Sequence, residues 1–298
     1  MSIDIVIRQK GLFKKALPLS VILGDHLVGG TYDQFYCLQE GHVSSGEEMA
    51  VYDPAHKARG FTVSWTRKSA TLRALNPTSA HELETYFATV ERIMTYWNAT
   101  LEVDGFKNVP LPTFLDSLKD MIEHNRRYLE VFSDKILAGE KGPLTLCCAL
   151  WPLHFGVKEA QAAKAHPTGA ADYLAEWLHE KQSVDANYAT PSFYTEEGGL
   201  FGRFTFSADR QSIFPLKPMP PFGATDPQTG RAPVVEDYEI AFALPTEGKV
   251  IGNVPYDLFL DALDPDKVSY YDEGSILIAP HTEDETEALY LRAKRNLV

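Results

Sequence analysis

A strand pattern followed directly by a helix pattern in the first third of the chain constrains the fold most. Phe61, Val63 and Trp65 alternate with polar residues, which is the period-2 pattern of a strand with one buried face. After a turn at 67–69, residues 71–75 supply the returning strand. A hairpin of this kind is marginal alone and must cover its aromatic face with another element. The chain offers a helix immediately afterwards.

Residues 79–98 are predicted to form this helix, because their apolar residues fall on one stripe. The stripe comprises Leu83, Tyr86, Phe87, Val90, Ile93, Met94 and Trp97. Ser79 followed by Glu82 is the capping-box pattern of a helix start, and Pro77 keeps the preceding residues extended. The order strand, strand, helix indicates a sheet with the helix packed on one face.

A second long amphipathic helix is predicted over residues 112–138, with Pro112 in its first turn and Gly139 after its end. The remaining patterns predict strands at 3–9, 143–153 (a central strand), 192–196, 200–207, 238–244 and 268–279, and helices at 18–24, 158–186 (in two pieces broken near His166-Pro167) and 282–296. We therefore predict an α+β protein in which a mixed, mainly antiparallel sheet is packed by long amphipathic helices.

The helix-start pattern P-x-[ST]-x-x-E occurs after an apolar strand pair at Pro77–Glu82 and again at Pro280–Glu285. Two interpretations are open: capped helices after strands arise independently, or the chain contains two related β-β-α halves. The length is compatible with one large domain or two moderate ones. We place the halves at residues 1–140 and 141–298, with a single domain as the alternative.

The charge balance is acidic, because 28 Lys and Arg face 41 Asp and Glu, and 28 − 41 = −13 with histidine neutral. This net charge repels phosphate backbones, since nonspecific nucleic-acid binding needs clustered cations. The one basic cluster is small and comprises Arg8, Lys10, Lys14 and Lys15. We therefore predict no nucleic-acid partner, and we expect the acidic exterior to dock onto a basic protein partner.

Membrane and secretion signals are not apparent in the sequence. No apolar run approaches the roughly 20 residues that span a bilayer. The short run 16–23 carries Pro18 and lacks a cleavage pattern, so it is not interpreted as a signal peptide. Cys37, Cys147 and Cys148 are odd in number and form no C-x-x-C pair, which argues against a disulfide framework. We expect a cytoplasmic protein with reduced thiols and no membrane partner.

The usual signatures of cofactor, metal and catalytic sites are missing. There is no phosphate-binding glycine loop, no nucleophile elbow and no H-E-x-x-H motif, since the stretch beginning His81-Glu82 ends in Thr85. Asp120 and His124 stand one helical turn apart as a minimal metal pair, but a surface ion pair is the simpler interpretation. We therefore predict no cofactor and no metal.

Two groups of residues are the remaining candidates for a site. His154, at the end of an apolar strand, and the paired carboxylates Glu196 and Glu197, in a hairpin turn, are weak catalytic candidates, because adjacent acids can raise a pKa. A core or capping role is the alternative for His154. Candidate binding residues are aromatic and charged groups at turns, namely Tyr194, Arg203, Tyr270, Tyr271 and Asp272. A sheet edge explains the tyrosines equally well.

The proline-rich stretch 214–236 is the longest segment without a periodic pattern. Segments of this length inside a domain are usually functional or disordered. A packed surface loop and a binding loop are both open interpretations.

The chain resembles an uncharacterised bacterial family that is known only as a domain of unknown function. The resemblance rests on the opening strand with its Phe13-Lys14-Lys15 segment, on the two P-x-[ST]-x-x-E helix starts and on the length of 298 residues. It implies a bacterial cytoplasmic protein and carries over no catalytic residue. The acidic balance and the capped helices are also similar to small bacterial immunity proteins, in which an acidic face covers a basic toxin.

The leading hypothesis is therefore a non-enzymatic, acidic protein-interaction module of the immunity or inhibitor type. The first alternative is an enzyme with an unrecognised pocket that uses His154, Glu196 and Glu197. The second alternative is a structural unit that assembles through a sheet edge.

Overall fold

The structure, a computed structural model, describes residues 2–225 and 230–295. Its contacts group the chain into two compact units, Met1–Ser183 and Val184–Val298, and each unit is described by itself. Helices and mixed, mostly antiparallel sheets confirm the predicted α+β class. None of the helices within the described ranges is long and apolar enough to cross a membrane.

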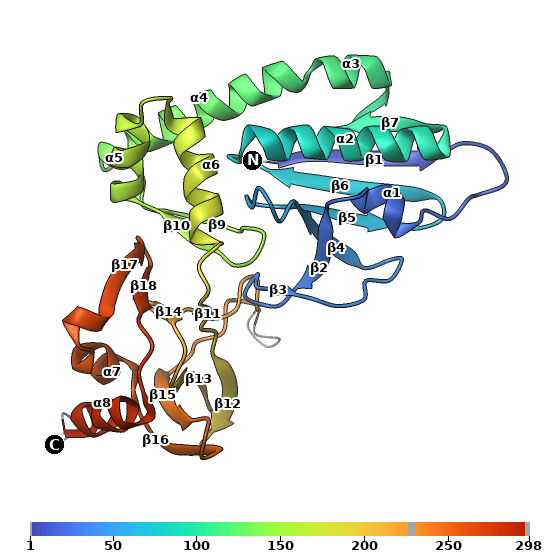
Figure 1. Cartoon of the computed structure of the whole chain (residues 1–298). Coiled ribbons are helices and arrows are strands. Elements are labelled where there is room, and N and C mark those ends of the chain that lie inside the picture. The colour runs from blue at the N-terminus through green and yellow to red at the C-terminus, as the bar shows by residue number, and fades with distance from the viewer. Residues whose placement is uncertain (1, 226–229, 296–298) are drawn as a thin grey trace. The chain divides into compact units, whose positions relative to one another are not determined.

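An eight-stranded antiparallel sheet organises the first unit (Figure 1). In spatial order its strands are β3 (Leu38–Gln39), β2 (Val28–Tyr32), β4 (Glu48–Tyr52), β5 (Phe61–Trp65), β6 (Ser69–Leu75), β1 (Ser2–Gln9), β7 (Ala99–Val103) and β8 (Phe106–Val109). The opening strand β1 lies inside the sheet, with Ile5 paired to Leu72 on one side and to Val103 on the other. The predicted opening strand and the predicted hairpin are both confirmed.

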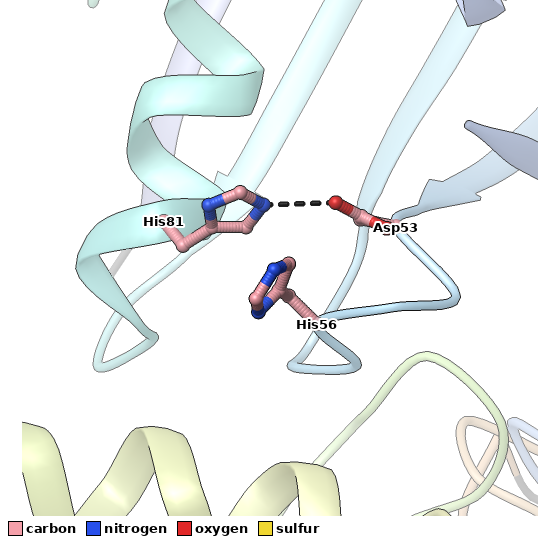
Figure 2. A group of neighbouring side chains, drawn as sticks. All are labelled: Asp53, His56 and His81. Carbon is pink, nitrogen blue, oxygen red and sulfur yellow. Dashed lines mark hydrogen bonds and ion pairs between the residues drawn. The ribbon is translucent and has the colours of Figure 1, made fainter. Parts of the chain in front are cut away.

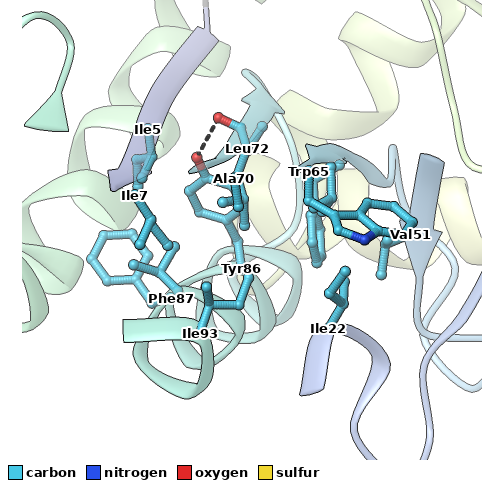
Figure 3. Close-up of a cluster of buried hydrophobic side chains, with 14 of the residues drawn as sticks. Ile5, Ile7, Ile22, Val51, Trp65, Ala70, Leu72, Tyr86, Phe87 and Ile93 are labelled. Atoms are coloured by element: carbon cyan, nitrogen blue, oxygen red, sulfur yellow. Dashed lines mark hydrogen bonds between the residues drawn. The ribbon is translucent and has the colours of Figure 1, made fainter. Parts of the chain in front are cut away.

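Helix α2 (Ala80–Trp97) packs on this sheet through its apolar stripe (Figure 3). Ile5 from the sheet and Tyr86 from the helix are completely buried. The Tyr86 hydroxyl lies 3.1 Å from the carbonyl oxygen of Ile3 and 3.2 Å from that of Leu72, so this buried donor is satisfied. Phe87 stacks on Phe114 with ring centroids 4.1 Å apart. The short helix α1 (Leu19–Leu23), also predicted, contacts α2.

The helix predicted over 112–138 is divided into α3 (Leu111–Asp116) and α4 (Leu118–Leu137). The division falls at Ser117, whose hydroxyl donates to the carbonyl oxygen of Phe114 at 2.6 Å. Such local bonds from serine compete with the helical ladder. The buried Asn125 of α4 accepts from the Thr78 N–H at 2.9 Å and donates to the Thr78 carbonyl at 2.7 Å. Helix α4 is thereby attached to the segment that begins α2.

The predicted central strand at 143–153 is wrong. These residues supply β9 (Leu144–Leu146) and the start of β10 (Leu153–Phe155), which form a separate two-stranded sheet. Their apolar character comes from packing near α5 (Val157–Ala165) and α6 (Ala170–Lys181), as the contact of Phe155 with Trp177 illustrates. The predicted break between these two helices is confirmed. Helices α5 and α6 both contact α4, and the chain divides into its two units between Ser183 and Val184. The halves 1–140 and 141–298 stay a prediction.

The second unit contains two four-stranded sheets with helices α7 (Tyr256–Ala262) and α8 (Glu283–Arg295) and the short 3-10 helix η1 (Pro265–Lys267). One sheet has the order β12 (Ser192–Glu196), β13 (Gly199–Ser207), β15 (Asp237–Leu244) and β16 (Lys249–Pro255). The other has the order β11 (Asn187–Tyr188), β14 (Ser212–Pro215), β18 (Ser275–Ile278) and β17 (Val268–Asp272). The pairs β13–β15 and β11–β14 are parallel, and the other pairs are antiparallel.

Aromatic side chains fill the core of the second unit. The buried phenylalanines are Phe204, Phe206, Phe214, Phe242 and Phe259. Helix α8 begins with a complete capping box, because the Glu285 N–H donates to the Thr282 hydroxyl at 3.2 Å and the Thr282 N–H donates to Glu285 Oε2 at 2.8 Å. Both helix-start motifs thus follow an antiparallel hairpin, while the relatedness of the two halves stays a prediction.

Replacing Phe87 by alanine should lower the free energy of unfolding by about 3–5 kcal/mol, because it leaves a cavity between α2 and Phe114. Phe106 is the matched control, since it is 75% exposed in the same unit and Phe106→Ala should change stability by less than about 0.5 kcal/mol. Urea unfolding of both variants measures the difference. Equal stability of the two variants would contradict the assigned core.

Candidate metal centre

Asp53, His56 and His81 form a cluster of metal-binding side chains in the first unit (Figure 2). One donor atom from each residue lies within 4.8 Å of the other two. His81 Nε2 is 2.9 Å from Asp53 Oδ2, and the rings of His56 and His81 have centroids 4.1 Å apart. Asp53 is buried, His81 is half-buried and His56 is exposed, so the cluster has a protected base and an open side.

Local backbone structure places these three side chains. Asp53 directly follows β4, and its Oδ1 accepts the Ala55 N–H at 2.8 Å in an Asx turn. The His56 N–H donates to the Asp53 carbonyl oxygen at 3.1 Å, which closes the turn and brings His56 beside Asp53. His81 lies in the first turn of α2, and the tautomer with a proton on Nε2 donates to Asp53 Oδ2. One carboxylate oxygen therefore shapes the turn while the other faces histidine.

The environment of Asp53 favours its ionised form. Burial raises the pKa of this carboxyl, but hydrogen bonds from His81 and from the Ala55 N–H, together with electrostatic interactions with His81 and His26, outweigh burial. The net effect holds the pKa below its ordinary value of 3.8. The Asp53 carboxylate is consequently charged at neutral pH, which is the form that binds a cation.

The buried carboxylate of Glu82 joins the two segments that carry the histidines. It accepts hydrogen bonds from the Gly60 N–H and the Thr78 hydroxyl. Gly60 ends the loop that carries His56, and Thr78 precedes the helix that carries His81. Ser79 caps this helix as predicted, by accepting the Glu82 N–H at 3.1 Å, but the Glu82 carboxylate is directed to the loop. The capping pattern therefore also serves to position the cluster.

Further hydrogen bonds fix the loop between Asp53 and β5 along its length. The Lys57 N–H donates to His179 Nδ1 at 3.1 Å, and the buried Gln182 side chain donates to the Ala58 carbonyl at 2.7 Å. Arg59 Nε donates to the Cys147 carbonyl at 2.9 Å. A loop held at successive residues keeps His56 near His81 with little loss of further chain entropy on binding a ligand.

Two imidazoles and one carboxylate are a ligand set used for Zn²⁺ and for other divalent transition metals. Zinc bonds of about 2.0–2.2 Å place tetrahedral ligand atoms about 3.4 Å apart. The donor atoms of the cluster lie within 4.8 Å of one another, and the exposed His56 side chain has the freedom to adjust to this spacing. A cation would replace the proton that His81 and Asp53 share. Three protein ligands would leave positions for water or a substrate oxygen.

The sequence-based catalytic candidates lie in different units. His154 belongs to β10 in the first unit, whereas Glu196 and Glu197 belong to the second unit and are exposed. Glu197 and Gly198 have φ values of 50° and 86° and form the tight turn between β12 and β13, so the predicted hairpin is confirmed. The two glutamates therefore lie at a solvated turn.

Tyr194 and Arg203 are diagonal neighbours on the paired strands β12 and β13, since Tyr194 pairs with Phe201 and Arg203 pairs with Ser192. The Arg203 guanidinium lies 4.5 Å from the centre of the Tyr194 ring and forms an ion pair with Glu239. The Tyr194 hydroxyl donates to Glu239 Oε1 at 2.9 Å. A pocket of about 260 Å³ next to this group is lined by, among others, Tyr194, Glu196, Asp237, Tyr238 and Glu239. The pocket is both aromatic and acidic.

The remaining binding candidates have different environments on β17. Tyr270 is 39% exposed, whereas Tyr271 and Asp272 are buried. Asp272 Oδ1 accepts the Gly274 N–H at 2.9 Å and so shapes the turn to β18. Of these three residues, Tyr270 alone is exposed at the surface.

The Asp53, His56 and His81 cluster is not apparent in the sequence, because its members do not lie within one short motif. Asp53 and His56 come from a turn, and His81 comes from a helix that follows a whole hairpin. The available signal was the Asp53-Pro54-Ala55-His56 turn after an apolar strand, combined with a histidine in the first turn of the next helix.

A family model described as a domain of unknown function (DUF4299) matches residues 2–289, and the chain belongs to this family. The predicted family resemblance is thereby confirmed. Neither a curated protein nor a solved structure matches the chain significantly.

Replacing Glu82 by alanine should lower the free energy of unfolding by about 2–6 kcal/mol, because each of the two buried donors left without an acceptor costs about 1–3 kcal/mol. The affected donors are the Gly60 N–H and the Thr78 hydroxyl. Glu84→Ala is the matched control on the same helix, since Glu84 is exposed and should contribute less than about 0.5 kcal/mol. Urea unfolding compares the variants, and equal midpoints would refute the role given to Glu82.

Proposed function

We propose that the protein binds a divalent transition-metal cation through Asp53, His56 and His81 and presents its open coordination positions to water or to a small oxygen-containing substrate. The observation that carries this proposal is the convergence of three donor atoms within 4.8 Å of one another. Zn²⁺ is the ion of first choice, because the set combines imidazole nitrogen with carboxylate oxygen and leaves room for a fourth ligand.

The surroundings of the cluster support this proposal. Metal-binding side chains are generally held by a second layer of hydrogen bonds that fixes their orientation. Here the Asx turn holds Asp53, and the Glu82 carboxylate connects the His56 loop to the helix of His81. A bound metal would supply Lewis acidity at these open positions. An acidic chain also raises the local concentration of cations at its surface.

Titration calorimetry with Zn²⁺ should give one strong site per chain in the unsubstituted protein. His81→Ala and Asp53→Asn should each weaken Zn²⁺ binding by about a hundredfold or more, because one of only three protein ligands is removed. Glu82→Gln should weaken it by about 10–100-fold while leaving all ligands present. His42→Ala is the control, since His42 is exposed and lies outside the cluster. Unchanged affinity in the His81 and Asp53 variants would refute the site.

A second candidate function is the acidic protein-interaction module of the immunity or inhibitor type. The net charge of −13 supports it, because an acidic exterior steers a basic protein partner toward the surface. The aromatic and acidic pocket beside Tyr194 offers carboxylates to one cationic side chain, and the Tyr194 ring already accepts the Arg203 guanidinium over its face. The free thiols Cys37, Cys147 and Cys148 suit the cytoplasmic location expected for such a protein.

The alternative enzyme that uses His154, Glu196 and Glu197 receives less support. Both glutamates are exposed at a turn, where the surface does not exclude water from a reacting group. The metal cluster is therefore the better starting point for any search for catalysis.

Binding of a fluorescent arginine-rich peptide tests the interaction hypothesis. We expect binding at low ionic strength that weakens at high ionic strength, because exposed charges are screened. Glu196→Gln with Asp237→Asn should weaken it about tenfold. The control variant, Glu84→Gln with Glu91→Gln, makes the same change in net charge on exposed positions of α2. Equal losses in both variants would reduce the effect to net charge and exclude the pocket.

A further inference from the structure

The loop between β1 and α1 exposes two large apolar side chains in adjacent positions. Leu12 is 95% exposed and Phe13 is 97% exposed. The loop that joins β1 to α1 extends beyond the end of β1 (Figure 1). Single exposed apolar residues are common on protein surfaces, but an adjacent pair with almost no contact to the rest of the chain marks a binding surface.

The base of this loop is fixed by hydrogen bonds. The buried Gln9 side chain accepts the Lys15 N–H at 2.7 Å and donates to the Lys15 carbonyl at 2.9 Å. The Trp97 indole donates to the same carbonyl at 2.9 Å, and Lys14 Nζ donates to the Gln9 carbonyl at 2.5 Å. The sequence therefore holds Leu12 and Phe13 away from the core on a defined base.

Positive charges surround this apolar tip. The loop itself carries Lys10, Lys14 and Lys15, and the β5–β6 turn contributes Arg67 and Lys68. This turn is adjacent to the loop, because Gln9 bonds to the Arg67 carbonyl at 3.1 Å and to the Lys68 carbonyl at 3.0 Å. Residues 8–20 and 65–69 contain no Asp or Glu. We name residues 10–15 with Arg67 and Lys68 the basic-apolar loop.

We propose that the basic-apolar loop docks on an anionic lipid surface, with Leu12 and Phe13 inserted among the headgroups and the cations facing lipid phosphates. Interfacial membrane binding combines these two features: buried apolar area and basic residues that attract anionic lipid. A nucleic acid would satisfy the charges but would leave Leu12 without an apolar partner. The charge complementarity together with the exposed pair thus favours lipid.

The rest of the chain determines how such a contact is oriented. With a net charge of −13, the chain as a whole is repelled by anionic lipid, which favours an approach through the basic-apolar loop. The contact is peripheral and requires no spanning helix. The sequence-based expectation of no membrane partner rested on the lack of a spanning segment, and this proposal goes beyond it.

Flotation with vesicles tests the proposal on the full chain. We expect binding to vesicles of phosphatidylglycerol mixed with phosphatidylcholine, weaker binding at high ionic strength, and little binding to phosphatidylcholine alone. Leu12→Ser with Phe13→Ser should lower the partition coefficient at least about tenfold, since tenfold corresponds to losing less than two buried CH₂ groups. Lys10→Glu with Lys68→Glu should lower binding to the anionic vesicles to a similar extent.

Phe106→Ser is the matched control, because it removes an exposed phenylalanine at another turn of the same unit. It should bind vesicles like the unsubstituted protein, and circular dichroism should show that all variants are folded. Failure of the unsubstituted protein to float with anionic vesicles would overturn the proposal, as would full binding by the Leu12 and Phe13 double variant. Binding to a DNA or RNA duplex without binding to vesicles would also overturn it.

Discussion

The buried carboxylate of Glu82 is the interaction on which the arrangement of the first unit depends most. A charged group taken out of water is costly unless hydrogen bonds replace its hydration. Glu82 obtains them from the Gly60 N–H and the Thr78 hydroxyl, which belong to segments on either side of the β5–β6 hairpin. Burial raises the pKa of Glu82, while these bonds and the charge of Arg59 oppose the rise. The carboxylate therefore sets where the loop after β4 meets the start of α2.

The position of the candidate metal cluster follows from this connection. Consecutive residues at a helix start point in different directions, so His81 faces Asp53 while Glu82 faces inward to Gly60. In the sequence, His81-Glu82 matches only the first two positions of an H-E-x-x-H motif. Its significance depends on Asp53 and His56, which the antiparallel pairing of β4, β5 and β6 brings near the helix. No spacing rule within one element can predict such a convergence.

Hydrophobic periodicity correctly predicted those helices and strands that bury only one face. The alternation of Phe61, Val63 and Trp65 gave the β5 strand, and the stripe that includes Tyr86 gave α2. The run at 143–153 failed because a continuous apolar segment does not reveal whether a sheet or helices will cover it. The division of the second long helix depends on one serine bond, from Ser117 to Phe114, which periodicity does not register. The fold class was therefore predictable, while the strand order and the site were not.

Charge is distributed unevenly along the chain, and this distribution bears on the proposed binding of metal, of a basic protein and of lipid. An acidic protein attracts metal cations and basic partners, yet it would be held away from anionic surfaces by the same charge. Residues 8–20 and 65–69 contain no Asp or Glu, which reduces that repulsion at this loop and the adjacent turn. At that place Gln9 and Trp97 hold the loop base, so Leu12 and Phe13 stay outside the core. An element that binds a lipid surface requires a fixed base, exposed apolar residues and neighbours without acidic charge. The loop combines these three features.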